Sequence, residues 1–193
     1  ETARNSIAAG WGGPQVMAGP VLVIPYPEQV DETVTEGGRQ VVKTTTQWRE
    51  LTLAPDATDM KTDLKPERRT RSIYEAVVYE AHTTGRARFV LPADLARYGV
   101  TLDRLAFDRA ELRFGLRDAR GLFGAPPRVT IEGKRLVLQP GKGPTETNGS
   151  GFFLWLDVRS LTTRPLEAQF DYAFRGNGWV SLMPNGGDTR WTV

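Results

Sequence analysis

The sequence lacks several residue types on which common site chemistries depend. It has no cysteine, which excludes a disulfide framework, a thiolate zinc site and a cysteine nucleophile. Its single histidine, His82, leaves essentially oxygen ligands for any metal, so we predict no catalytic metal and no cofactor. No apolar run reaches about 18 residues, the length of a membrane span, and no Gly-x-Ser-x-Gly nucleophile elbow occurs.

The net charge of the chain is also small. Basic residues number 25 and acidic residues 23, and the two kinds are interleaved, so the net charge is only +2 and no nucleic-acid partner is expected. The densest basic cluster consists of Arg68, Arg69, Arg71, Arg86 and Arg88. These residues either contact anionic lipid or envelope polymer, or form a solvated face partly neutralised by nearby glutamates, and the second interpretation is favoured.

Short strands dominate the pattern of the chain. Residues 110–116 and 166–174 alternate strictly between apolar and polar side chains, which predicts strands with one buried and one wet face. Residues 21–24 are wholly apolar and predict a strand buried on both faces. We therefore expect a mainly β fold, an antiparallel β-sandwich or open barrel with one to three short helices, in a single domain over residues 1–193.

Two helices and several turns punctuate these strands. Residues 1–9 and 93–98 favour helices that end before Gly10 and Gly99, respectively. Residues 83–85 predict a turn that joins strands over 74–81 and 86–91, and residues 140–151 a mobile loop. Further turns are expected at Glu132-Gly133, Asn148-Gly149, Asn177-Gly178 and Asn185-Gly186.

The turn at Asn177 allows two hairpin registers. A two-residue turn sets polar against apolar side chains on both faces. A three-residue loop over residues 176–178 places Phe174 opposite Val180, so that the apolar side chains share one face. Exposing a large apolar side chain costs about 1.5–3 kcal/mol, so we predict the three-residue loop.

Few residues suggest chemistry of their own. His82 is more simply an exposed residue at a strand end than a general base. The acidic pairs Asp31-Glu32 and Asp56/Asp59 lie in polar connections, and their mutual geometry cannot be read from sequence. The loop around Lys142 lacks the spacing of a phosphate-binding loop. Trp155 and Trp179 are expected in the core or at its rim, whereas Trp11 either anchors a helix on the sheet or marks a contact surface, the anchor being favoured.

Several segments follow one another in a distinctive order: Trp11-Gly12-Gly13-Pro14-Gln15 with residues 18–25, then residues 69–74 ending at Tyr74 with residues 77–79, then residues 115–122 with Asp118 and Arg120, then residues 174–179 with Met183-Pro184 and Thr189. Together they resemble the CreD family of bacterial inner-membrane proteins, also called cell envelope integrity proteins. The resemblance covers nearly the whole chain from about residue 4. It departs from the family at Asn177, where a small residue is usual, and over residues 31–62, which match little.

The resemblance implies a periplasmic domain between one N-terminal and several C-terminal membrane helices, in a protein tied to envelope stress. Residues 1–9 would end a helix that leaves the membrane, and the flanking transmembrane helices would lie outside this chain. The family implies no enzymatic activity and no catalytic residues. Its motifs supply candidate interaction residues, namely Trp11, Gly12, Gly13, Gln15, Tyr74, Asp118 and Arg120.

We therefore expect a non-enzymatic interaction module that contributes to envelope integrity from the periplasmic side of the inner membrane. Its partner would be an envelope protein, lipid or polymer, together with its own membrane helices. The alternatives are a hydrolase of cell-wall or lipid material that uses carboxylates, and a structural role in assembling the membrane part. For Asp118 and Arg120 a structural role is favoured, with Asp118 capping backbone N–H groups after the strand and Arg120 closing the turn.

Overall fold

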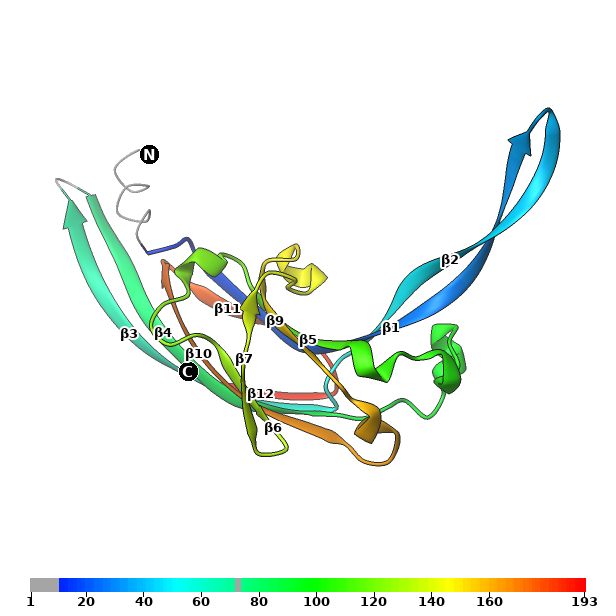
Figure 1. Cartoon of the computed structure of the whole chain (residues 1–193). Coiled ribbons are helices and arrows are strands. Elements are labelled where there is room, and N and C mark those ends of the chain that lie inside the picture. Colours follow the sequence, from blue (N-terminus) through cyan, green and yellow to red (C-terminus); the bar gives the residue numbers. More distant parts are fainter. Residues whose placement is uncertain (1–10, 72–73) are drawn as a thin grey trace.

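The computed structural model describes residues 11–71 and 74–193, and two β-sheets that share one core form the body of the molecule (Figure 1). Sheet A contains β1 (Gln15–Glu36), β2 (Arg39–Leu53), β5 (Ala110–Leu116), β8 (Gln139–Pro140), β9 (Gly151–Leu156) and β11 (Val180–Met183). Sheet B contains β3 (Ala57–Arg71), β4 (Tyr74–Phe89), β6 (Arg128–Ile131), β7 (Lys134–Val137), β10 (Leu166–Asn177) and β12 (Asp188–Thr192). The helical segments of these residues are short 3-10 turns: η1 (Leu95–Tyr98), η2 (Leu102–Arg104), η3 (Phe107–Arg109), η4 (Ala119–Gly121), η5 (Thr145–Thr147) and η6 (Arg159–Thr162).

This architecture confirms the predicted mainly β fold. Strand pairs are antiparallel except for β1 with β11 and β3 with β12, which run parallel. The helix expected over residues 93–98 is reduced to the 3-10 turn η1, which Gly99 ends with a positive φ of 71°. The helix expected over residues 1–9 lies outside the described residues.

The core lies between the two sheets and is largely aromatic. The alternating side chains of β5 and β10 point inward as predicted, and Phe114 of sheet A meets Phe170 of sheet B with ring centroids 5.2 Å apart. Phe152 meets Tyr172 in the same way at 4.9 Å. Such edge-to-face pairs join the sheets through the geometry that aromatic rings prefer.

The predicted turn at residues 83–85 is wrong, because β4 runs through them without a break. Gly85 has a packing role there. A Cβ on Gly85 would lie 2.6 Å from the Phe170 ring and 2.7 Å from the carbonyl oxygen of Asp59. Glycine inside a strand often marks such a close approach, and a two-residue Thr run before it does not make it a turn.

The predicted hairpin at residues 176–178 is also wrong. The apolar face of β10 is buried as expected, but Phe174 is opposite Ala81 of β4, and Val180 is opposite Gln15 of β1 in the other sheet. The chain crosses from sheet B to sheet A at Gly178, whose N–H donates to the carbonyl of Val77. The alternating pattern correctly predicted the buried face of the strand, but it did not identify the partner strand.

The outer parts of β1 and β2 form a two-stranded arm, defined here as residues 25–50. The arm extends away from the sandwich as a twisted ribbon (Figure 1), and none of its residues is buried. At about 3.4 Å per residue it reaches roughly 40 Å. Residues 31–62, which resembled the family little, thus form most of this arm, the end of β2 and the start of β3.

Candidate functional site

The motif residues of the N-terminal segment meet at one end of the sandwich around the side chain of Gln15. This side chain is fully buried. Its Nε2 donates to the carbonyl oxygens of Asp118 and Arg175, at 3.0 and 2.9 Å, and its Oε1 accepts from the backbone N–H of Asp118 at 3.0 Å. One amide therefore satisfies backbone groups of two other segments, which ties the start of β1 to both sheets.

The glycines of this motif bring backbones close together. Gly12 has a positive φ of 78°, and its carbonyl accepts from Nδ2 of Asn177 at 3.1 Å. The carbonyl of Gly13 accepts from the backbone N–H of Asn177 at 3.3 Å. Asn177, the position at which the sequence departs from the family pattern, therefore holds the segment in place together with Gln15.

Trp11 is half-buried and lies between two guanidinium groups. The guanidinium carbons of Arg69 and Arg175 are each 4.9 Å from its ring centroid. Arg175 also pairs with Glu80 at 2.7 Å. These cation–π contacts fasten the tryptophan to β3 and β10, in the manner of an anchor.

Asp118 and Arg120 form the turn that the sequence predicted. Oδ1 of Asp118 accepts from the backbone N–H of Arg120 at 3.1 Å, and the Arg120 guanidinium binds both carboxylate oxygens at 2.8 and 2.9 Å. The Arg120 hydrogen bond is the main reason that the pKa of Asp118 lies below its ordinary value. The capping role is therefore confirmed.

The candidate interaction residues do not all lie together. Trp11, Gly12, Gly13, Gln15 and Asp118 share the junction just described, and Arg120 projects from it with 91% of its side chain exposed. Tyr74 starts β4 at the tip of the β3–β4 hairpin, in register with Arg71. The junction as a whole performs a packing role for which no chemistry is required.

The remaining candidates are also dispersed. His82 lies within β4, which corrects its placement at a strand end, and its Nε2 is 2.7 Å from Oδ1 of Asp171. Asp31 bonds to Thr44 on the arm and Asp56 pairs with Arg88, so the acidic candidates do not converge. Within residues 11–71 and 74–193, no cluster of three or more histidine and carboxylate side chains could hold a metal ion.

The predicted basic cluster is split by the length of β4. Arg69 is opposite Ala76 near one end of the β3–β4 hairpin, whereas Arg88 is opposite Ala57 at the other end. The two groups could share a region only if β4 turned back at residue 85, which it does not. Arg68 pairs with Glu75 and Arg69 with Glu67, in line with the favoured interpretation of a partly neutralised face.

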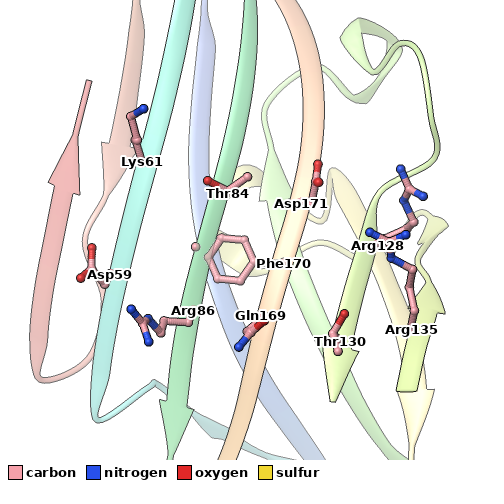
Figure 2. Close-up of a pocket in the computed structure, with 11 residues that line it drawn as sticks. Asp59, Lys61, Thr84, Arg86, Arg128, Thr130, Arg135, Gln169, Phe170 and Asp171 are labelled. Carbon is pink, nitrogen blue, oxygen red and sulfur yellow. The ribbon is translucent and has the colours of Figure 1, made fainter. Parts of the chain in front are cut away.

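The outer face of sheet B carries a basin that the sequence did not reveal (Figure 2). The basin has a volume of about 540 Å³ and is open to solvent. Eleven residues line it: Asp59, Lys61, Thr84, Gly85, Arg86, Arg128, Thr130, Arg135, Gln169, Phe170 and Asp171. Four of them are cationic and two are carboxylates, so the basin has a positive excess.

The basin is built from two rows of residues that cross neighbouring strands. One row runs Asp59, Arg86, Gln169, Thr130 and Arg135 over strands β3, β4, β10, β6 and β7. The next runs Lys61, Thr84, Asp171 and Arg128 over the first four of these strands. Only Gln169 and Asp171 were predicted from sequence as outward members of an alternating strand, and the strand order brings the other residues of the two rows beside them.

Three guanidiniums of the basin have no carboxylate partner. Among the described residues, Arg86, Arg128 and Arg135 make no ion pair within 4.0 Å, which is also true of Arg39, Arg97, Arg104, Arg109, Arg117 and Arg190. Nine arginines are paired: Arg49, Arg68, Arg69, Arg88, Arg113, Arg120, Arg159, Arg164 and Arg175. Nε of Arg128 is buried and has no hydrogen-bond partner among them either. Packing, and not a counter-ion, holds this side chain at the basin.

The outer face of sheet A is built differently. Glu111, only 7% exposed, accepts from Nζ of Lys142 at 2.5 Å and from Nε1 of Trp155 at 3.0 Å, and it pairs with Arg113 at 2.6 Å. Arg113 also pairs with Glu50 at 2.7 Å. Burial alone would raise the pKa of Glu111, but the hydrogen bonds and charges of Lys142 and Arg113 outweigh it and hold the pKa below its ordinary value.

Comparison with known proteins decides the family. The family described as "Inner membrane protein CreD" matches residues 1–193. The chain belongs to the CreD family. It is 24% identical over 195 residues to the inner membrane protein CreD of Escherichia coli (strain K12), a match that covers 98% of the chain. No solved structure is significantly similar to it.

The match covers only part of the CreD relative. The chain spans 40% of the length of the Escherichia coli protein. Within residues 11–71 and 74–193, no helix has the length and apolar character needed to cross a membrane. The described CreD segment therefore consists of the sandwich, its arm and the junction that the family motifs form.

Proposed function

We propose that this chain is the periplasmic domain of a CreD-family inner membrane protein, and that it acts as a non-enzymatic interaction module in envelope integrity. The observation that carries the proposal is the arm of residues 25–50. The resemblance of the motifs and the family match support the membrane context, and the arm supplies a surface that reaches away from the sandwich.

The arm contributes little to the core, so packing does not account for its length. An isolated two-stranded hairpin is marginally stable in water. Cross-strand contacts hold this one in shape, including Arg49 with Glu28 at 2.7 Å and Thr44 with Asp31 at 2.6 Å. The arm exposes Trp48 (54%) near its base, where Arg109 lies over the ring, and Val42 (63%) toward its tip, residues suited to contact with a partner protein.

Side-of-membrane labelling tests the periplasmic placement. These 193 residues contain no cysteine, so a Gly37→Cys substitution adds a single thiol at the tip of the arm. In the full-length protein, with any cysteine elsewhere replaced, we expect a membrane-impermeant maleimide to label this thiol in intact spheroplasts. Labelling only after lysis would refute the placement.

Trimming the arm tests the interaction role. Replacing residues 27–48 by Asn-Gly joins Tyr26 to Arg49, which are already opposite each other, by a two-residue turn. We expect the sandwich to keep its unfolding midpoint within a few degrees, whereas cells that carry the trimmed full-length protein survive envelope stress no better than cells without it.

A matched pair of point variants makes this test specific. Val41 on the arm and Val90 in the body are 40% and 41% exposed, respectively. We expect Val41→Arg to reduce stress survival and Val90→Arg to leave it unchanged, at equal protein levels in the membrane. Equal effects of the two substitutions, or full survival with the trimmed arm, would contradict the proposal.

A further inference from the structure

We propose that the basin on the outer face of sheet B binds an extended acidic polysaccharide, whose acidic groups reach the two cationic ends of the basin. This site lies on the other sheet from the arm and does not depend on it. The inference starts from the unpaired guanidiniums and from their arrangement across the strands.

The cations of the basin form two poles. Arg86 lies on β4 opposite Asp59 of β3, with Lys61 of β3 diagonal to it, and Arg128 and Arg135 lie on β6 and β7 (Figure 2). Strands are about 4.8 Å apart, so β4 is roughly 10 Å from β6 and 14 Å from β7. A single small anion meets one pole, whereas a chain with acidic groups about 10–14 Å apart meets both.

The surface between the poles is suited to sugar hydroxyl groups. Gln169 and Thr130 lie between Arg86 and Arg135 in one row, and Thr84 lies in the next row. Their amide and hydroxyl groups both donate and accept hydrogen bonds. Gln169 and Thr130 both line the open basin, so their polar groups are accessible to a ligand.

Three features favour a polysaccharide over a lipid surface. The basin is hollowed, and a flat bilayer cannot follow its floor. Phe170, its one large apolar residue, is 3% exposed, which leaves no apolar group to enter the bilayer. Asp59 and Asp171 interrupt the positive charge, and Asp171 accepts from His82, so the charge is arranged in poles and does not form the uniform patch that anionic membranes attract.

Two pairs of arginine substitutions test the proposal at matched charge. Arg86→Gln with Arg135→Gln removes one cation from each pole. Arg49→Gln with Arg164→Gln removes the same charge from exposed residues elsewhere, which are 52% and 63% exposed and pair with Glu28 and Glu132. A third variant, Gln169→Glu, places a carboxylate between the poles without removing a cation.

Binding to the 193-residue chain is measured by calorimetry at low salt, with tetragalacturonate, galacturonate monomer, inorganic phosphate and phosphatidylglycerol vesicles as probes. We expect saturable binding of the tetramer, weakened at least about tenfold by the basin pair and weakened by Gln169→Glu, and changed less than about twofold by the control pair. Unfolding midpoints of all three variants establish that they remain folded.

The other outcomes overturn the proposal. Monomer or phosphate bound as tightly as the tetramer indicates a small-anion site. Vesicles bound in preference to the tetramer indicate a membrane surface. If the basin pair and the control pair lose equal affinity for the tetramer, the attraction is one of unspecific charge. The absence of saturable tetramer binding rules the site out.

Discussion

The outer faces of the two sheets both carry charged residues, but within the described part of the chain the charges around Glu111 on sheet A are paired and the arginines at the basin of sheet B are not. On sheet A, Glu111 lies among Arg113, Lys142 and Trp155, and each charge has a partner. On sheet B, Arg86 and Arg135 face an open basin without any carboxylate partner among the described residues. Both faces belong to strands that alternate inward apolar and outward polar side chains, so the alternation alone does not distinguish them.

The difference lies in what covers each face. The segment that carries Lys142 folds over β5, and Trp155 of β9 lies beside it, which buries the carboxylate of Glu111. No segment among the described residues folds in this way over the basin of sheet B. A half-buried charge must be paired to be tolerated, whereas an exposed charge can stay unpaired in water. We infer that the charges of sheet A stabilise the fold and that those of sheet B are available to a ligand.

The largest expected effect is the removal of Glu111. In Glu111→Ala, Arg113 keeps only Glu50, and its side chain is 15% exposed. We expect the free energy of unfolding to fall by about 2–3 kcal/mol, because a largely buried charge loses its main partner. Chemical denaturation measures this loss.

The matched change on sheet B is Arg86→Ala, which removes an exposed and unpaired cation. It should change the free energy of unfolding by no more than about 0.5 kcal/mol. If Arg86→Ala costs as much as Glu111→Ala, the proposed division between the two faces is wrong.

The effect of Glu111 on stability should also depend on pH, and we expect this dependence to be smaller than the loss in Glu111→Ala. The pKa of Glu111 is lowered in the folded chain, so its contribution is full above the ordinary carboxyl pKa and is lost as the pH falls through the lowered value. We expect Glu111→Gln to be less stable than the parent chain near neutral pH, and the difference to shrink on acidification below about pH 4.3. Urea denaturation at a series of pH values follows this change.

The arginines of the basin provide the contrast. Their charge does not change over this acidic range. The Arg86→Gln, Arg135→Gln variant should therefore follow the parent chain with the same slope from neutral pH downwards. A difference that grows or shrinks on acidification would show that the basin is coupled to a carboxylate.

Much of the fold was predictable because burial follows alternation. The inward faces of β5 and β10 were read directly from residues 110–116 and 166–174, and the cap at Asp118 followed from local turn chemistry. Partner strands were not predictable in the same way. Phe174 is opposite Ala81, 93 residues earlier in the chain, and Val180 joins the other sheet. An alternating pattern predicts which face of a strand is buried, whereas long-range packing determines which strand pairs with it.

The candidate sites were less predictable for the same reason. Glu111 was expected on a wet face, but Lys142 and Trp155, 31 and 44 residues away, enclose it. The basin requires the strand order β3, β4, β10, β6 and β7, which no local motif encodes. The Trp11–Gln15 motif was visible in sequence, but its packing role became clear only from the contacts that Gln15 makes.

The smallest expected effect concerns the salt dependence of the basin. Arg128 is opposite Val137 and Arg135 is opposite Thr130, so the two arginines occupy diagonal positions on β6 and β7. Side chains at such positions are close enough for like charges to repel. At low salt we therefore expect Arg135→Gln to raise the free energy of unfolding by about 0.3 kcal/mol, and this gain should vanish near 0.5 M NaCl, roughly where the Debye length falls below 5 Å.

The loss of stability in Glu111→Ala should change less with salt, because the ion pairs of Glu111 are largely buried. Denaturant unfolding of both variants at low and high salt makes the comparison. A loss of stability in Arg135→Gln at low salt would mean that Arg135 has a stabilising partner and that the basin, like sheet A, uses its charges to hold the fold.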